Sequence, residues 1–213
     1  YNGYSIVIPY VEYYLNAVMN RVRQGCTASD PDLADDLATF VRQETQHSRY
    51  HLRFNQRMLD AGIRGLKPLI DEIVSDLRRQ LESRSIAFNA AYCAGFESIA
   101  TYDSQYIFEE CDEYFAGADA HGANLLLWHV AEEFEHRAVC HRAVRAAGGG
   151  WLTRIHGLVY AFWHVGGAFV RAERLVLEHH LATLSPEERR ASLRRSRSLF
   201  WRQIRYVAPR MLR

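Results

Sequence analysis

Residues 127–136 read LWHVAEEFEH and residues 40–47 read FVRQETQH, and these two stretches decide the fold. Each contains a Glu-x-x-His pair, Glu133 with His136 and Glu44 with His47. Residues three apart on an α-helix lie on the same face, so each pair can offer a carboxylate and an imidazole to one metal ion. Such pairs also arise by chance in a chain with 10 histidines, so the two pairs alone are a weak signal.

A lone glutamate precedes each pair and makes the signal specific. Glu12 lies 32 residues before Glu44, and Glu97 lies 36 residues before Glu133. The chain therefore repeats one order twice: a glutamate, about the length of a helical hairpin, and then Glu-x-x-His. One glutamate from each of two helices and Glu-x-x-His from each of two others surround the metal pair of di-iron and di-manganese bundles. The predicted ligands are Glu12, Glu44, His47, Glu97, Glu133 and His136.

Further residues share the helical stripes of these ligands. His129 precedes Glu133 by four positions, and we favour it as a seventh ligand. His51 lies in the same way beyond His47, as an additional ligand or as a hydrogen-bond donor behind the ligands. Thr101 follows Glu97 by four positions and is a candidate proton relay, although a small core side chain is the favoured interpretation, as it is for Cys93 and Cys140. Glu12 and Glu97 sit in apolar runs, where a carboxylate is costly to bury without a cation.

The helical period predicts an all-α bundle of four long helices with an additional C-terminal pair. Pro9 suggests a first-turn proline, and Asp30-Pro31 and Asp119 suggest helix starts. Ser185 and Glu188 form a capping box, and Pro209 is expected to end the last helix near residue 207. The predicted helices span about residues 9–24, 31–62, 69–116 (bent near 83–85 or at Gly95), 119–148, 151–184 and 186–207. We predict one domain over residues 1–213, with its core bundle at about 5–148 and the C-terminal pair at about 151–207.

Composition excludes several classes of protein. The net charge is +1, yet residues 185–213 carry nine arginines against two glutamates, and the rest of the chain is negative. We therefore expect no nucleic-acid partner for the chain as a whole. Four widely spaced cysteines without a Cys-x-x-Cys pair argue against a disulfide scaffold and predict reduced thiols and a cytoplasmic location. The apolar stretch at residues 155–170 is short of the ~20 residues that span a bilayer.

Three stretches resemble a known family. Residues 8–14 (IPYVEYY), residues 40–47 with His51, and residues 127–136 look like the bacterial proteins described as predicted metal-dependent hydrolases. The resemblance covers roughly residues 5–150 and implies a ferritin-like four-helix bundle. One departure is Ser98, where that family is expected to carry a histidine after the glutamate. The spacing of His129, Glu133 and His136 is also similar to that of the di-iron p-aminobenzoate N-oxygenases, which implies a di-iron site and oxygen chemistry.

The expected function is that of a di-iron oxygenase. Two iron ions, cycling between Fe²⁺ and Fe³⁺, would use O2 as co-substrate to hydroxylate or N-oxygenate a small organic substrate, with an external electron donor. Manganese or a mixed metal pair is an alternative. A two-metal hydrolase, as the family description suggests, and a ferroxidase or iron-binding protein are the alternative functions. Metal hydrolases usually show more aspartates, and storage sites fewer histidines, so both fit the ligand set less well.

The C-terminal segment suggests partners beyond the metals. Its arginines could hold an anionic handle on the substrate, or contact a membrane surface, which is the less favoured partner. The favoured interpretation is a solvated arginine face, with Leu199, Phe200, Trp201, Ile204 and Tyr206 packing inward. The apolar helix around residues 155–170 is expected to cover the pocket, to belong to the core, or to form a homodimer face.

Overall fold

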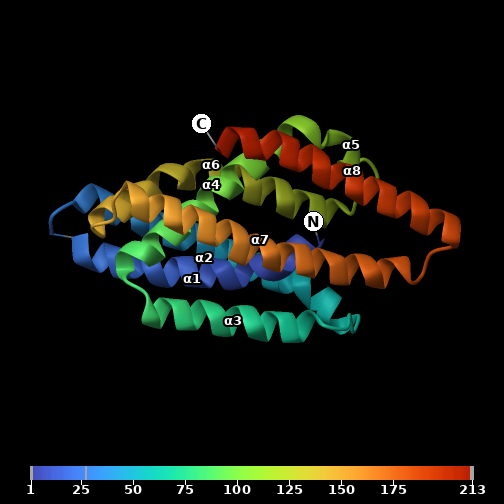
Figure 1. Ribbon diagram of the computed structural model, residues 1–213, viewed down its shortest axis with the longest axis horizontal. Coiled ribbons are helices and arrows are strands. Elements are labelled where there is room, and N and C mark those ends of the chain that lie inside the picture. The colour runs from blue at the N-terminus through green and yellow to red at the C-terminus, as the bar shows by residue number, and fades with distance from the viewer. Residues whose placement is uncertain (1, 27, 212–213) are drawn as a thin grey trace.

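A computed structural model of the chain describes residues 2–26 and 28–211, and these residues contain helices and no strand. The helices are α1 (Asn2–Cys26), α2 (Pro31–Asp60), α3 (Leu66–Ser83), α4 (Ile86–Glu110), α5 (Asp112–Phe115), α6 (Ala120–Ala146), α7 (Trp151–Leu181) and α8 (Pro186–Met211). The predicted all-α class is confirmed. The long helices run side by side along the length of the molecule, with α3 at one edge and α8 at the other (Figure 1).

The core lies among the helices that carry the predicted ligands. Helix α1 packs along α2, and α4 packs along both α6 and α7. Helix α7 also lies against α1, while α3 contacts α1 and α8 contacts α4. The main core cluster of buried apolar side chains draws on α1, α2, α3, α4, α6 and α7. No helix within the described ranges is both long and apolar enough to cross a membrane.

Three predicted helix starts are confirmed by side-chain caps. The carboxylate of Asp30 accepts a hydrogen bond from the backbone N–H of Leu33 at 2.9 Å, and Asp119 accepts one from Gly122 at 2.8 Å. At Ser185, the backbone N–H and the hydroxyl both donate to the carboxylate of Glu188. These bonds satisfy backbone groups that a helix end otherwise leaves without partners.

The predicted helix over residues 69–116 is wrong as a single element. The helix is interrupted at Arg84 and Ser85, whose backbones are extended. The hydroxyl of Ser85 accepts a hydrogen bond from the backbone N–H of Phe88 and caps the start of α4. Helix α3 also begins earlier than predicted, at Leu66. The predicted bend near residues 83–85 therefore lies at the right place, but it is a break between two helices and not a bend within one.

The C-terminal helix also departs from its prediction. Helix α8 continues through Pro209 to Met211, because Val207 is buried against a small cluster with Tyr106 and Met211 packs on the same cluster. The predicted inward packing of Phe200 and Trp201 is wrong, since these side chains are 44% and 53% exposed. Val207 is the residue of α8 that is buried.

Pro9 lies inside α1 instead of in its first turn, because the helix begins at Asn2. A proline has no N–H, so the carbonyl of Ser5, four residues earlier, loses its helical partner. The side chain of Asn55 on α2 replaces that partner and donates to the Ser5 carbonyl at 2.6 Å. The Ser5 hydroxyl in turn donates to Oδ1 of Asn55 at 2.7 Å. A side chain from the neighbouring helix therefore allows α1 to run past its proline.

Replacing Asn55 with alanine is expected to lower the free energy of unfolding by about 1–3 kcal/mol, because it leaves buried polar groups of Ser5 without partners. Chemical denaturation followed by circular dichroism measures the change. The control is Asn124→Ala at an exposed position of α6, which should stay within about 0.5 kcal/mol of the parent chain. Equal stability of the two variants would contradict this role of Asn55.

Two glycines bring α4 and α7 into direct backbone contact. A Cβ added at Gly157 would lie 2.3 Å from the backbone carbon of Ala91, and one added at Gly95 would lie 2.6 Å from Cα of Leu158. Real Cβ atoms do not approach other heavy atoms so closely. Because Gly95 and Gly157 carry no side chain, the backbones of α4 and α7 can touch. Helix α7 therefore packs directly on α4, the helix that carries Glu97.

Candidate metal centre

The structure brings the predicted ligands together in the interior of the bundle. They come from α1 (Glu12), α2 (Glu44, His47 and His51), α4 (Glu97) and α6 (His129, Glu133 and His136). Each of these eight side chains is buried. Their helices place them as the repeated order of the sequence predicts, with one glutamate on each first helix and a Glu-x-x-His pair on each second helix.

His136 lies at the meeting point of three carboxylates. Its Nδ1 atom is 2.8 Å from Oε1 of Glu44 and 3.7 Å from an oxygen of each of Glu97 and Glu133. These three glutamates belong to three different helices. His136 and its neighbours therefore join α2, α4 and α6 at one point.

His129 and His47 form the other side of the cluster. Nε2 of His129 is 3.1 Å from Glu133, and its Nδ1 is 3.7 Å from Glu12. Nδ1 of His47 is 3.6 Å from Glu44 and 3.9 Å from Glu12. Glu12 thus faces histidines from both α2 and α6.

Three of the glutamates, Glu12, Glu44 and Glu133, are each shared between two groups that could hold a metal ion. In four groups of three residues, the candidate ligand atoms all lie within 4.8 Å of one another. The groups are Glu12–Glu44–His47, Glu44–Glu133–His136, His47–His129–Glu133 and Glu12–His51–His129. Glu12, Glu44 and Glu133 each belong to two of these overlapping groups, as a carboxylate that bridges two ions must.

The donor atoms of the cluster fit a metal pair. In the described part of the chain, several of its buried atoms have no aligned hydrogen-bond partner. They are Oε1 of Glu12, Oε1 of Glu44, Nδ1 of His47, both carboxylate oxygens of Glu97, Oε2 of Glu133 and Nδ1 of His136. Buried polar atoms in folded proteins nearly always have a partner, so a concentration of orphaned atoms at one place calls for an ion. Carboxylate and imidazole together suit iron, manganese and zinc.

The pKa values show how the cluster balances its charge in the absence of metal. Burial, reinforced by Glu44, raises the pKa of Glu12 well above its usual value, and burial with Glu133 does the same for Glu97. Burial opposes the charge of His136, but Glu44 and Glu133 outweigh it and raise its pKa to about 12. Without metal ions, protons on Glu12, Glu97 and His136 reduce the negative charge of the cluster. Metal ions that bind there must displace these protons.

Comparison with known proteins gives one match. The family described as "Predicted metal-dependent hydrolase" matches the chain over residues 1–213. The chain belongs to this family. Neither the curated proteins nor the solved structures include a significant match. The family match thus extends over α7 and α8, beyond the residues 5–150 in which the resemblance was visible.

In this member of the metal-dependent hydrolase family, a further set of side chains orients the candidate ligands. Nε2 of His47 donates to the carboxylate of Glu132 at 2.7 Å, which leaves Nδ1 to face the cluster. Nε2 of His136 donates to the amide oxygen of Gln43 at 3.3 Å. The hydroxyl of Ser48 donates to Glu12 at 2.8 Å. Such outer partners set the tautomer and orientation of metal-binding histidines. Sequence reasoning missed Gln43 and Ser48 and left Glu132 as an outer-face or outer-sphere group.

Glu132→Ala is expected to weaken metal binding by about 10- to 100-fold, because His47 loses the acceptor that orients its ring. Equilibrium dialysis against ferrous or manganous ions measures the affinity. The control is Glu82→Ala on α3, since Glu82 is exposed and belongs to none of the candidate ligand groups. Equal affinities of the two variants would show that Glu132 does not position His47.

His51 presents a nitrogen lone pair to the cluster. The Ser5 hydroxyl gives its only proton to Asn55, so it accepts the hydrogen bond from Nδ1 of His51 at 2.7 Å. Burial, with His129 nearby, lowers the pKa of His51 well below its usual value and keeps the ring neutral. A neutral ring with its proton on Nδ1 has no proton on Nε2. This Nε2 atom faces Nδ1 of His129 at 3.3 Å. This chemistry supports His51 as an eighth ligand.

The proposed relay residues lie beside Glu97. Thr101 is buried, and its hydroxyl donates to the backbone carbonyl of Glu97 at 2.8 Å. Its role as a proton relay stays a prediction. Burial, with Glu97 nearby, raises the pKa values of the Cys93 and Cys140 thiols, which keeps both protonated.

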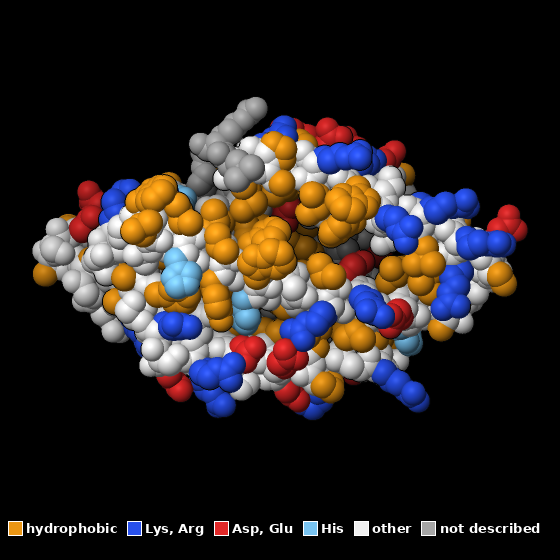
Figure 2. Space-filling view, viewed as in Figure 1, with side chains coloured by type: hydrophobic (Ala, Val, Ile, Leu, Met, Phe, Trp, Pro, Cys, Tyr) orange, Lys and Arg blue, Asp and Glu red, His pale blue; other side chains and the backbone are white. Residues whose placement is uncertain are grey.

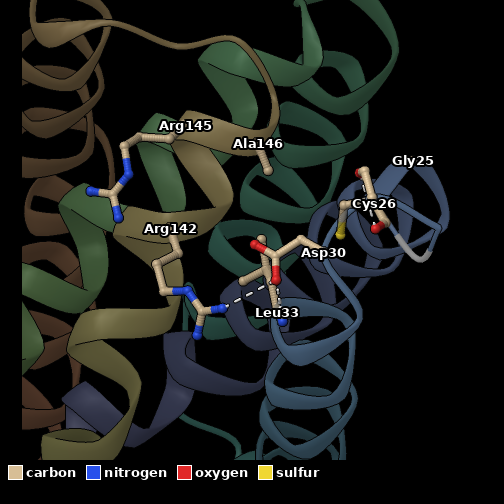
Figure 3. Close-up of a pocket in the computed structure, with 8 residues that line it drawn as sticks. Gly25, Cys26, Asp30, Leu33, Arg142, Arg145 and Ala146 are labelled. Atoms are coloured by element: carbon tan, nitrogen blue, oxygen red, sulfur yellow. Dashed lines mark hydrogen bonds and ion pairs between the residues drawn. The ribbon is translucent and has the colours of Figure 1, made fainter.

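Two surface pockets lie outside the ligand cluster. One, of about 230 Å³, opens where the C-terminal ends of α1 and α6 meet the start of α2. Figure 3 shows Arg142 reaching across it toward Asp30, 3.5 Å away. Because Asp30 also caps α2, this contact ties α6 to the start of that helix.

The other pocket, of about 250 Å³, lies between α4, α6 and α7 and is lined by Ser98, His141 and Trp151 among others. None of the described residues that line either pocket belongs to the cluster.

Proposed function

We propose that the chain is a di-iron oxygenase that uses O2 to hydroxylate or N-oxygenate a small organic substrate. The observation that carries this proposal is that Glu12, Glu44 and Glu133 each belong to two groups of candidate ligands. A single metal ion needs no carboxylate in such a position, whereas a pair of ions does. Four glutamates and four histidines from four helices are also the donor types found in di-iron bundles.

The residues of the chain would do most of the work around the ions. Glu12, Glu44, Glu97 and Glu133 would supply negative charge, and His47, His51, His129 and His136 would complete the ligand set. When bound, the iron pair would supply the electron transfer to O2 that side chains cannot perform. The burial of all eight side chains keeps bulk water from the cluster. Inserting one oxygen atom of O2 into a substrate and reducing the other to water consumes two further electrons and two protons, so the reaction needs an external electron donor.

A two-metal hydrolase is the second candidate, and the family description favours it. In that case the same residues would hold the ions that generate hydroxide and polarise an ester or phosphoryl group. The same side chains would hold the ions in either function, although metal hydrolases usually show more aspartates than this set contains. The two reactions differ in the metal that they need and in whether they consume O2.

Metal analysis and oxygen consumption separate the two functions. The purified chain is expected to carry about two iron ions, and the anaerobically reconstituted ferrous protein should give a transient visible absorption band on mixing with O2. The Glu44→Ala chain, treated in the same way, is the control and should give no band. A chain that holds zinc, ignores O2 and cleaves a phosphoester or carboxylic ester would establish the hydrolase instead. Oxidation of many iron ions per chain without any organic substrate would indicate a ferroxidase.

A further inference from the structure

An apolar stripe runs along the outward face of α7. Its large side chains are between 40% and 73% exposed, and they are Trp151, Ile155, Val159, Phe162, Trp163 and Val170. Their spacing of mostly three or four residues places them along one side of the helix. Figure 2 shows hydrophobic side chains gathered on the face of the molecule that α7 crosses. Contiguous exposed apolar surface of this kind marks an interaction site.

Helix α8 adds aromatic and basic side chains to the same view of the molecule. Leu193, Phe200 and Trp201 are between 44% and 53% exposed. Arg194 and Arg197 are also exposed, and they precede Trp201 by seven and four residues. These spacings place both arginines on the side of α8 that carries Trp201. Figure 2 shows the arginines as a basic area along α8, beside the apolar area over α7.

The charge of these two helices is one-sided. Helices α7 and α8 together contain eleven arginines against four glutamates and no aspartate. Because the whole chain has a net charge of +1, the remaining residues sum to −6. Most of the positive charge belongs to α8, whose eight arginines and two glutamates give a net charge of +6 beside the apolar stripe of α7.

We propose that the face formed by α7 and α8 binds the surface of an anionic lipid membrane. Helices that lie in a membrane interface combine tryptophan, phenylalanine and leucine with arginine or lysine, as this face does. Anionic headgroups attract each basic residue near the surface, so its charge is complementary to that of the face. A second copy of the chain is a poorer partner, since it would bring a second set of arginines against the first. The proposal does not depend on the metal or on the reaction.

Vesicle flotation tests this proposal with the full chain. The protein is expected to float with vesicles of phosphatidylcholine that contain about a third phosphatidylglycerol, and at least tenfold less with phosphatidylcholine alone. Raising the salt should weaken the binding, because salt screens the charges. Three of the four tryptophans lie on the face, so their fluorescence should shift to shorter wavelength on binding. No flotation with the anionic vesicles, or equal flotation with both kinds, would overturn the proposal.

Paired variants separate the apolar and the basic contributions. Arg194→Gln with Arg197→Gln should weaken binding to anionic vesicles about 25-fold, at about fivefold for each arginine near the surface. Trp163→Ser with Trp201→Ser should weaken it at least fivefold and reduce the fluorescence shift. The matched control is Val74→Ser with Arg78→Gln, both exposed on α3, which should bind like the parent chain. Circular dichroism confirms that each variant is folded.

Self-association is the competing outcome. Analytical ultracentrifugation of the parent chain should show a monomer at vesicle-assay concentrations. A dimer that the tryptophan variant dissociates, together with unchanged vesicle binding in the arginine variant, would assign the face to a second copy and overturn the membrane proposal.

Discussion

Replacing Glu44 with alanine is expected to abolish binding of the metal pair. Glu44 belongs to two of the four candidate ligand groups and approaches His136 to 2.8 Å, so its loss removes a ligand from both of these groups. The same change takes the counter-charge from His136, whose raised pKa depends on it. Elemental analysis after reconstitution with excess ferrous iron is expected to give about two metal ions for the parent chain and none for the variant.

The control for this experiment is again Glu82→Ala. Glu82 is exposed on α3, a helix that carries none of the candidate ligands, so the variant should keep the full metal content. Retention of two metals by the Glu44→Ala chain would remove Glu44 from the site and, with it, the argument for a bridged pair.

Gly157→Ala is expected to destabilise the fold by about 3 kcal/mol or more, at the upper end of the effects of overpacking. The added Cβ would meet the backbone of Ala91 at 2.3 Å, and neither helix backbone can yield without moving other contacts. Urea denaturation measures the loss of stability. Since α4 also carries Glu97, a forced separation of α4 from α7 should also lower the metal content.

The control lies ten residues further along the same helix. A Cβ at Gly167 would meet nothing within 4 Å, so Gly167→Ala should stabilise the chain by about 0.5–1 kcal/mol through the higher helix propensity of alanine. Destabilisation by both substitutions would mean that α7 tolerates no alanine for some reason other than the contact with Ala91.

The ligand cluster could be predicted from the sequence because helical geometry is local. A spacing of three or four residues fixes which side chains share a face, so Glu133 and His136 had to point the same way. The partners Gln43 and Ser48 could not be predicted in this way. Their roles depend on how α2 is rotated against α1 and α6, and that rotation is decided by packing across the bundle.

The errors in the fold have the same origin. A local reading of the sequence places Pro9 at a helix end. Helix α1 continues through Pro9 because Asn55, from another helix, bonds the Ser5 carbonyl that the proline leaves without a helical partner. Phe200 and Trp201 were expected to pack inward because large apolar side chains usually do so, but α8 contacts the body mainly near Val207 and leaves them exposed. In both cases the local sequence pattern gave the wrong prediction, because the outcome depends on contacts between residues far apart in the sequence.

The distribution of ligands over the helices also bears on how the chain folds. Glu12, Glu44 and His47 lie on the α1–α2 hairpin, and Glu97 and Glu133 lie on α4 and α6, so each half gathers its ligands across short stretches of chain. Contacts between the halves close much longer loops and cost more chain entropy. A metal pair bridged by Glu44 and Glu133 would act as a cross-link between the two halves. Metal ions present during refolding should therefore stabilise the assembled bundle far more than either hairpin.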